Sequence, residues 1–280
     1  MCPVAVVTDS TATLPQELAE KYDIRVAPLY INWDRERYRD GIDIKPEEFY
    51  QRLRQSKTLP TTSGAVQSEF LDIFESLRSK VDGIVVFTVA TELSAAYNSA
   101  NIARVLVPDL PIKIVDSRMA TIAMGFGVIA AAKKASTGGN MEEVTKAAKD
   151  IFSKVQFFFV LDTLDYLRRG GRVNLPAAVM ANLLRVKPIL TLNDGKVVPV
   201  ARPRTRAKAL EKLLDLMSKG TTDSPLHIGI MHGDDLDGVA QLKQKITARY
   251  NYSELVITDF TPVMGAHTGP GLLGIAFYNE

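Results

Sequence analysis

Four short apolar runs, separated by helix-like segments, constrain this chain more than any other feature of its sequence. The runs are VAVVT (4–8), IRVAPLY (24–30), GIVVFTV (83–89) and IKIVDS (112–117). A strand that is apolar on both faces has to be covered on both faces, as in a parallel sheet with helices on either side. The segments between the runs are PQELAEKY, KPEEFYQRLRQS, VQSEFLDIFESLRSK and ELSAAYNSANIARVL. The first half therefore predicts a doubly wound, three-layer α/β/α domain with a mostly parallel sheet.

The second half of the chain predicts a different α/β unit. Two helix-like stretches, FGVIAAAKKAS and MEEVTKAAKDIFSKV, are separated by Gly-Gly-Asn, a typical helix break. Since 280 residues suffice for two ordinary cores, we expect domains at 1–155 and 156–280. Asp194-Gly195 is a strong hairpin signal, so the second sheet should be mixed. Its expected strands lie in VQFFFVLDT, PILTLNDGKVVPVAR, LHIGIM, ELVITDF and LGIAFY.

Charge and cysteine content exclude several classes of protein. Thirty-four Lys and Arg against 32 Asp and Glu leave a net charge of +2, too small to indicate nucleic-acid binding by bulk electrostatics. The single cysteine, Cys2, allows neither an internal disulfide nor a cysteine-rich metal site. The first strand-like run starts at Val4, which leaves no room for a leader, and no apolar run is long enough to span a membrane. We expect a soluble cytoplasmic protein.

Hydroxyl side chains gather at four turns between strand-like and helix-like segments. Such residues cap the free amides at helix starts, and capping alone is one interpretation. The alternative is a ligand site, because open α/β sheets bind ligands at strand ends and helix N-termini favour anions. Four such turns exceed what capping requires, so we expect a receptor for a carboxylate or phosphate. The turns hold Asp9, Ser10, Thr11 and Thr13; Thr61, Thr62 and Ser63; Ser94; and VDSRMAT (115–121).

Arginines surround two glycines in LDYLRRGGRVN. Arg168, Arg169 and Arg172 flank Gly170 and Gly171. A glycine pair ends a helix and lets the backbone approach a ligand closely, while guanidinium groups suit carboxylates and phosphates. Cations also stabilise a solvated helix C-terminus. The spacing alone therefore leaves an anion site and a helix end as alternatives.

His267 stands in the stretch GAHTGPGLLGIAFYNE, before a Gly-Pro-Gly turn and an apolar strand-like run. A lone histidine is more often a hydrogen-bonded structural residue than a catalyst, and both interpretations stay open. The letters GPGLLG fit GxGxxG, but they precede a strand, whereas a dinucleotide fingerprint follows a strand and opens a helix. We expect the glycines to shape a turn that presents His267.

Motifs of familiar catalytic families are missing from the sequence. It contains no GxxxxGK[ST], GxSxG or HExxH pattern. His227 and His232 flank the segment LHIGIM, and the HGDD that follows could bind a cation only weakly. We therefore expect neither a cofactor nor a metal site.

Seven motifs in order make the whole chain resemble the DegV family. They are VTDSTATLP, TTSGAVQSEF, ELSAAYNSA, VDSRMAT, LDYLRRGGR, VKPIL and HTGPGLLGIAFY. The resemblance implies an N-terminal α/β/α domain and a C-terminal two-layer α/β domain. It also implies a long-chain fatty acid in an apolar tunnel, with its carboxylate near the domain junction. The family's characterised members include the fatty-acid-binding subunits of bacterial fatty acid kinase.

Carried over motif by motif, the resemblance implies a ligand-binding set. Thr62, Ser63 and Ser94 match the family's carboxylate-binding hydroxyls, and Arg169 and His267 match residues at its head-group opening. The sequence departs from the family twice. It has Ser94-Ala95-Ala96-Tyr97 where members often have SGTY, and Ser63-Gly64-Ala65-Val66 where they often have SQPS.

The resemblance implies a carrier without enzymatic activity of its own. Its partners would be a long-chain fatty acid and a separate kinase that forms acyl phosphate for phospholipid synthesis. It implies no nucleic acid and leaves transient membrane contact open. Two alternatives remain: an acyl or phosphoryl hydrolase or transferase with Ser94 as nucleophile and His267 as base, and a lipid-sensing regulator.

Overall fold

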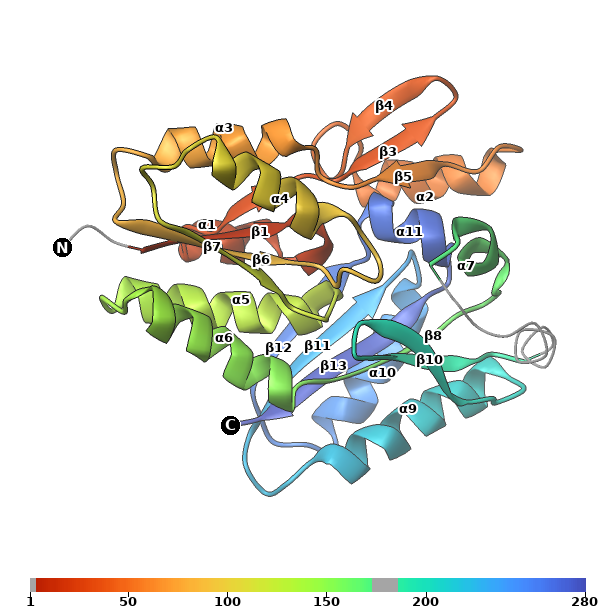
Figure 1. Ribbon diagram of the computed structural model, residues 1–280. Coiled ribbons are helices and arrows are strands. Elements are labelled where there is room, and N and C mark those ends of the chain that lie inside the picture. The colour runs from red at the N-terminus through yellow and green to blue at the C-terminus, as the bar shows by residue number, and fades with distance from the viewer. Residues whose placement is uncertain (1–3, 173–185) are drawn as a thin grey trace.

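A four-stranded parallel sheet forms the first layer of strands in the computed structural model, which describes residues 4–172 and 186–280 (Figure 1). Its order is β2 (Arg25–Ala27), β1 (Val4–Asp9), β6 (Gly83–Thr88) and β7 (Ile112–Asp116). The core residues of β1 and β6 alternate between its two faces. Val7, Ile84 and Val86 belong to the same core as helices α3 (Gln67–Leu77) and α4 (Ala96–Val105). Val6, Val85 and Phe87 pack with α5 (Thr121–Ser136) and α6 (Met141–Lys154).

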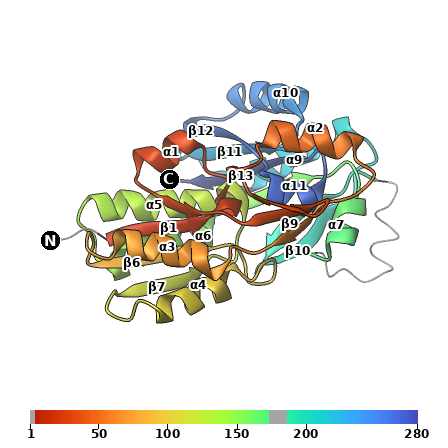
Figure 2. The same ribbon diagram turned by 90° about the horizontal axis from the view of Figure 1, so that it is seen from above.

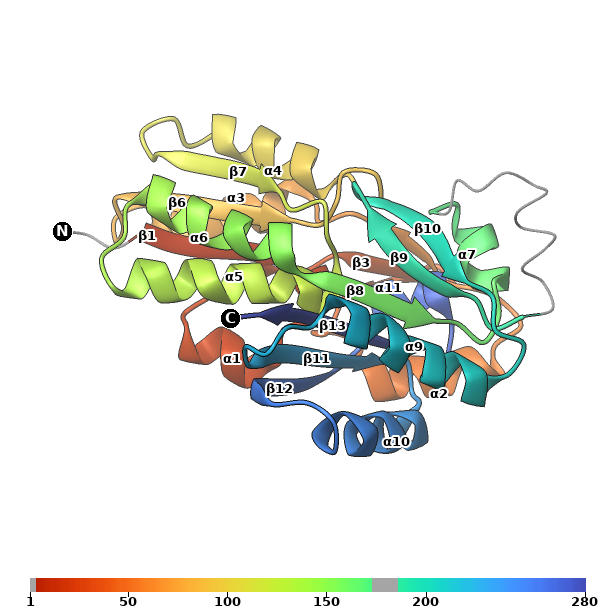
Figure 3. The same ribbon diagram turned by 90° about the horizontal axis from the view of Figure 1, so that it is seen from below.

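The six-stranded sheet is built from the second half of the chain (Figure 3). It is mixed, because only β11 and β12 pair in parallel. Helices α9 (Arg206–Gly220) and α10 (Leu236–Thr247) cover one face. Across the sheet the order is β10 (Lys196–Ala201), β9 (Ile189–Asn193), β8 (Gln156–Val160), β13 (Leu273–Asn279), β11 (Leu226–His232) and β12 (Tyr252–Asp259).

Helices α5 and α6 lie between the two sheets (Figure 1). Twelve of the 16 residues of α5 are buried. Gly127 lets the two helices approach closely, because a Cβ there would lie 2.1 Å from the ring of Phe152 in α6. The fold therefore alternates helices and sheets in five layers, and its largest core cluster reaches from β6 to β13.

A small antiparallel sheet beside the first layer was not expected from the sequence. It consists of β4 (Glu36–Arg39), β3 (Tyr30–Trp33) and β5 (Thr61–Ser63). The run IRVAPLY, expected to be one strand, is divided at Pro28 between β2 and β3, which belong to different sheets. Proline lacks the amide that a continuous ladder needs.

Four shorter or outlying helices complete the described elements. Helix α2 (Pro46–Gln55) lies close to α11 (Pro262–Thr268) in the view from above (Figure 2). Helix α7 (Asp165–Gly170) packs on α11 from the other side, while α1 (Gln16–Lys21) follows the 3-10 turn Ser10–Ala12.

The architecture confirms the predicted fold class: a three-layer unit with a parallel sheet, and a sheet-and-helix unit with a mixed sheet. The hairpin at Asp194-Gly195 is also confirmed, with φ of 52° and 80° at these two residues. The division into domains 1–155 and 156–280 stays a prediction. Among the residues that the structure describes, no helix is long and apolar enough to cross a membrane.

Candidate functional site

An apolar cavity lies where both larger sheets and the small sheet meet. Its empty space, counted together with the open mouth, is about 720 Å³. Its lining comes from both halves of the chain. The lining residues are Thr11, Leu29, Thr62, Ser63, Gly64, Val89, Leu93, Ser94, Ala120, Thr121, Phe157, Phe159, Leu167, Arg172, Leu192, Val197, Phe260, Val263, Met264, His267 and Thr268.

All four hydroxyl-rich turns of the sequence reach this cavity. Thr11 follows β1, Ser94 follows β6, Thr121 follows β7, and Thr62 with Ser63 lies on β5. Parallel strands bring their carboxyl ends to one edge, which is where an open α/β sheet forms its ligand crevice. The capping interpretation also holds in part, because three of these side chains accept from amides at helix starts. Asp9 accepts from Thr11 at 3.0 Å, Ser94 from Ala96 at 3.2 Å and Thr121 from Ala123 at 3.4 Å.

The apolar wall comes mostly from the six-stranded sheet and the segments around it. Phe157 and Phe159 of β8 stack with ring centroids 5.1 Å apart. Leu192 and Val197 line the cavity from the hairpin β9–β10, and Phe260 from the segment before α11. The sequence analysis did not assign these residues to a ligand site. The alternation in QFFFV marks two residues for one face, but which face is lined is decided by contacts with the other sheet.

A polar neck separates this cavity from a second, outer one. Thr62, His267 and Arg172 line both cavities, whereas Arg169 and Tyr166 line only the outer one. The neck therefore offers a hydroxyl and an imidazole at the end of an apolar interior, with Arg172 beside them and Arg169 in the outer cavity. This order of environments matches a molecule with an apolar tail and an anionic head.

His267 is held in the neck by a hydrogen bond of 2.7 Å between its Nε2 and Oγ1 of Thr62. Burial, aided by the positive charge of Arg172, lowers the pKa of His267 to about 4. The imidazole is therefore neutral near pH 7. A neutral ring that donates from Nε2 leaves the Thr62 hydroxyl proton free for an anion.

Ser94 and Gly64 face each other beside the neck. Ser94 Oγ accepts a hydrogen bond from the amide of Ala96 at 3.2 Å, so its own proton remains available. A Cβ on Gly64 would lie 3.3 Å from that oxygen. The family departure at position 64 therefore leaves more room around Ser94 than a larger residue would.

The three arginines were expected to form either an anion site or the charged end of a helix, and the structure shows some of each. Arg168 is exposed and lies 4.0 Å from Asp165 on the same helix. Arg169 and Arg172 are exposed and line the outer cavity. Gly171 takes a left-handed conformation, with φ of 66°, and ends α7 as expected.

Within residues 4–172 and 186–280, the arrangement expected of a hydrolase is not present. His267 bonds to Thr62, and its Nδ1 has no hydrogen-bond partner there, so no acidic residue orients the ring. The described residues contain no cluster of three or more His, Cys, Asp or Glu suited to a metal ion. The acids of HGDD are paired: Asp234 with Arg54 and Asp235 with Arg206.

Comparison with known proteins gives one consistent result. Residues 3–280 match the DegV family, described as an uncharacterised protein family. A DegV domain-containing protein of Caldanaerobacter subterraneus subsp. tengcongensis is 34% identical over 98% of both chains. A fatty-acid-binding DegV family protein from Thermus thermophilus has a TM-score of 0.93 at 30% identity, covering 99% of this chain and 100% of the other. DegV of Bacillus subtilis, a fatty acid binding protein, has a TM-score of 0.93 at 30% identity, covering 100% of both chains. This chain belongs to the DegV family.

Proposed function

We propose that the protein binds one long-chain fatty acid, with the acyl chain in the apolar cavity and the carboxylate at the neck. We further propose that it presents this carboxylate, in the cytoplasm, to a separate kinase that forms acyl phosphate. The observation that carries the proposal is the sequence of environments from the apolar cavity through the Thr62–His267 neck to the outer cavity with Arg169. The fatty acids bound by the two structural relatives support the choice of ligand.

The cavity accounts for most of the affinity. Each buried methylene contributes about 0.8 kcal/mol, so a chain of about sixteen carbons could gain on the order of 10 kcal/mol before the costs of association. A carboxylate leaving water needs several hydrogen-bond donors. Thr62, Ser63 and Ser94 can supply them without a fully buried counter-charge, while the neutral His267 donates to Thr62 and leaves that hydroxyl proton for the carboxylate. These residues therefore fix orientation more than they add affinity.

The outer cavity suits the proposed transfer. A carboxylate held at the neck keeps one oxygen directed outward, where it can attack the γ-phosphorus of ATP held by the kinase. The bond between that phosphorus and the leaving ADP breaks, giving acyl phosphate and ADP. Arg169 and Arg172 would then lie near the new phosphoryl group. In this proposal the chain itself performs no chemistry.

Extraction and mass spectrometry test the binding step. The purified protein should release about one fatty acid per chain. Ser94→Ala and His267→Ala should lower occupancy or speed exchange of labelled oleate, because each removes a head-group contact. Thr137→Val is the control, since Thr137 is exposed and bonds only to Lys134 O at the end of α5. A chain that carries no lipid and takes up no added oleate would contradict the proposal.

The kinase step needs its own measurement. The loaded protein is incubated with ATP and the candidate kinase subunit, and acyl phosphate is trapped as the hydroxamate. We expect product only when both proteins are present. Product from this chain alone would show that it is an enzyme, and tight lipid binding without product from any candidate kinase would favour a lipid-sensing regulator.

A further inference from the structure

Helix α11 is held at its N-terminus by a carboxylate from the other end of the sequence. Oδ1 of Asp40 accepts a hydrogen bond of 2.9 Å from the amide of Val263, 223 residues away. Val263 is the second residue of α11, and the first amides of a helix have no partner within it. Thr261 stands at the N-cap position but makes no capping hydrogen bond. Asp40 supplies the cap that the local sequence does not.

Burying the Asp40 carboxylate at this place costs free energy. Its side chain is 3% exposed and lies close to Asp9, which is fully buried. No cation is among the groups that shift the pKa of either carboxylate. Burial raises the pKa of Asp40 to about 6, although hydroxyls of Ser10 and Thr261 offset part of the rise. An apolar residue would avoid this cost but could not accept from the Val263 amide, so a side chain with an acceptor at this place has an explanation beyond packing.

Helix α11 carries much of the proposed head-group site. Val263, Met264, His267 and Thr268 all line the cavity. Val263 and His267 are one helical turn apart, so a tilt at the first moves the second. A helix of seven residues has little stability of its own, and its orientation depends on what holds it.

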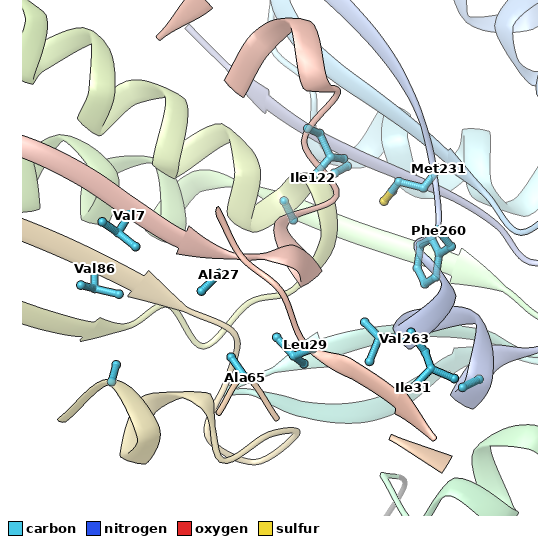
Figure 4. Packing of buried hydrophobic residues seen from close by; sticks show 14 of the residues in the cluster. Val7, Ala27, Leu29, Ile31, Ala65, Val86, Ile122, Met231, Phe260 and Val263 are labelled. Atoms are coloured by element: carbon cyan, nitrogen blue, oxygen red, sulfur yellow. The ribbon is translucent and has the colours of Figure 1, made fainter. Parts of the chain in front are cut away.

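Three contacts from the first half of the chain hold this helix. Asp40 bonds to its start, and Thr62 bonds to His267 near its end. In the middle, Gly265 packs so closely that a Cβ there would lie 2.7 Å from the hydroxyl of Tyr50. Figure 4 shows Val263 beside Leu29 and Ile31, so the capped end is also packed on its apolar side.

We propose that Asp40 is a positioning residue of the head-group site, which fixes α11 at Val263 and thereby places His267 against Thr62. The proposal rests on the proposed function only in naming a fatty acid as the ligand. Asp40 does not itself line the cavity, but it bonds to Val263, which does. It links the small sheet, which contributes Thr62, to the helix that contributes His267.

Three variants test this role: Asp40→Ala, Asp40→Asn and Asp43→Asn. Alanine removes the cap, whereas asparagine keeps an acceptor for the Val263 amide and is an equally good capping residue. Asp43 lies in the same turn but accepts its hydrogen bonds from Arg39 instead of from α11, which makes it the matched control.

Two readouts are needed. The first, made without ligand, is the pKa of His267 by NMR, with the exchange rate of the Val263 amide. In Asp40→Ala we expect the pKa to rise from about 4 toward 6.5 and the exchange to quicken, because the ring loses its buried place. The second is the dissociation constant for oleate, expected to rise roughly fivefold, the typical loss for a missing cap. Asp40→Asn and Asp43→Asn should match the wild type in both.

The outcomes separate this proposal from the function on which it rests. If no variant and no wild type binds oleate but the His267 pKa still moves in Asp40→Ala, the fatty-acid proposal fails and the positioning role stands. An Asp40→Ala protein that only melts earlier, with the His267 pKa and oleate affinity unchanged, overturns the positioning role. If Asp40→Ala does not fold, Asp40→Asn decides: a His267 pKa and oleate affinity like those of wild type support the role, and a shift of either with an unchanged Val263 exchange rate overturns it.

Discussion

At the neck of the cavity, one hydrogen bond joins the two halves of the chain. Thr62 comes from the small sheet and His267 from α11, and their side-chain atoms lie 2.7 Å apart. A movement of either β5 or α11 would break this hydrogen bond. In the proposed site this one hydroxyl has two purposes, to accept from the neutral imidazole and to donate to the carboxylate of the ligand.

Replacing Thr62 by valine tests this double purpose. The variant keeps the shape of the side chain but removes both hydrogen bonds. We expect the dissociation constant for oleate to rise about tenfold or more, because a bond to a charged group is worth roughly 1.5 to 3 kcal/mol. Calorimetry with Thr137→Val as the control checks the result. Equal affinities in all three proteins would remove Thr62 from the head-group site.

Protonation of Asp40 gives a second residue-scale prediction. Its pKa is about 6 in the folded chain against 3.8 in the unfolded chain, so between these values the folded state holds more protons. Ionisation of Asp40 therefore lowers stability as pH rises through this window. Asp40→Asn removes this cost, and its free energy of unfolding relative to wild type should increase from pH 4 to pH 7, on the order of 2 kcal/mol.

Urea denaturation of both proteins at each pH measures this difference. Asp9, whose pKa is also raised to about 6, is present in both proteins and largely cancels. His267 acts in the opposite direction, since its lowered pKa makes its contribution fall on acidification from 6.5 to 4, and it cancels as well. A flat or decreasing difference would mean that Asp40 is not buried as an ionised group.

The polar residues of the site could be predicted from the sequence, but the hydrogen bonds between distant segments could not. Thr62, Ser63 and Ser94 follow a local pattern of hydroxyls at strand ends, and all three line the cavity. Asp40 carries no such pattern. Its partner is 223 residues away, and nothing in the residues around it marks the amide that it will cap.

At the scale of elements, the packing of α7 on α11 decides where His267 stands. Gly170, the last residue of α7, lies so close that a Cβ would be 2.2 Å from Nδ1 of His267. Its backbone is a wall of the imidazole site. The two helices therefore cannot change their distance without moving the ring.

Gly170→Ala should disturb this wall. We expect α7 or His267 to shift, with oleate affinity falling at least fivefold and stability by roughly 1 to 3 kcal/mol, the usual cost of overpacking. Gly220→Ala is the matched control, because Gly220 also ends a helix and its Cβ would meet only the flexible side chain of Gln156. Unchanged oleate binding in Gly170→Ala would show that the contact is unimportant for the ligand.

The sequence predicted a hairpin where the turn residues themselves favour positive φ, and missed one where they do not. The hairpin at Asp194-Gly195 needs two residues with positive φ, which its sequence provides, and its strands pair as expected. The β3–β4 hairpin turns at Asp34-Arg35, with φ of 51° and 74°. Arginine rarely adopts this conformation, so no turn was expected there.

At the scale of the whole molecule, α5 and α6 form one layer of helices that packs against both larger sheets. Alternation of apolar runs and helices predicts both sheets, but not that one helix pair would serve both. The signal was present in FGVIAAA, since a helix that is apolar on all sides must be buried on all sides. The same two helices had been expected to mark the boundary between the two halves of the chain.

One cooperative transition should follow from this shared layer. Because the largest core cluster includes residues of both larger sheets, neither half can unfold without exposing the other. We expect one calorimetric peak, which added oleate moves upward as a single peak. Free ligand at about 100 times its dissociation constant should add about 2.7 kcal/mol. Two peaks, with only one of them shifted by oleate, would show that the halves unfold independently.

The position of β13 has a consequence for biosynthesis. Residues 273–279 lie in the middle of the six-stranded sheet, between β8 and β11. Among the described strands they are made last, only just after the helix that brings His267 to the neck. During translation the sheet therefore stays open at its centre until β13 has been made. The cavity likewise lacks Val263, Met264, His267 and Thr268 until α11 has been made shortly before, so a nascent chain cannot complete the proposed fatty-acid site earlier.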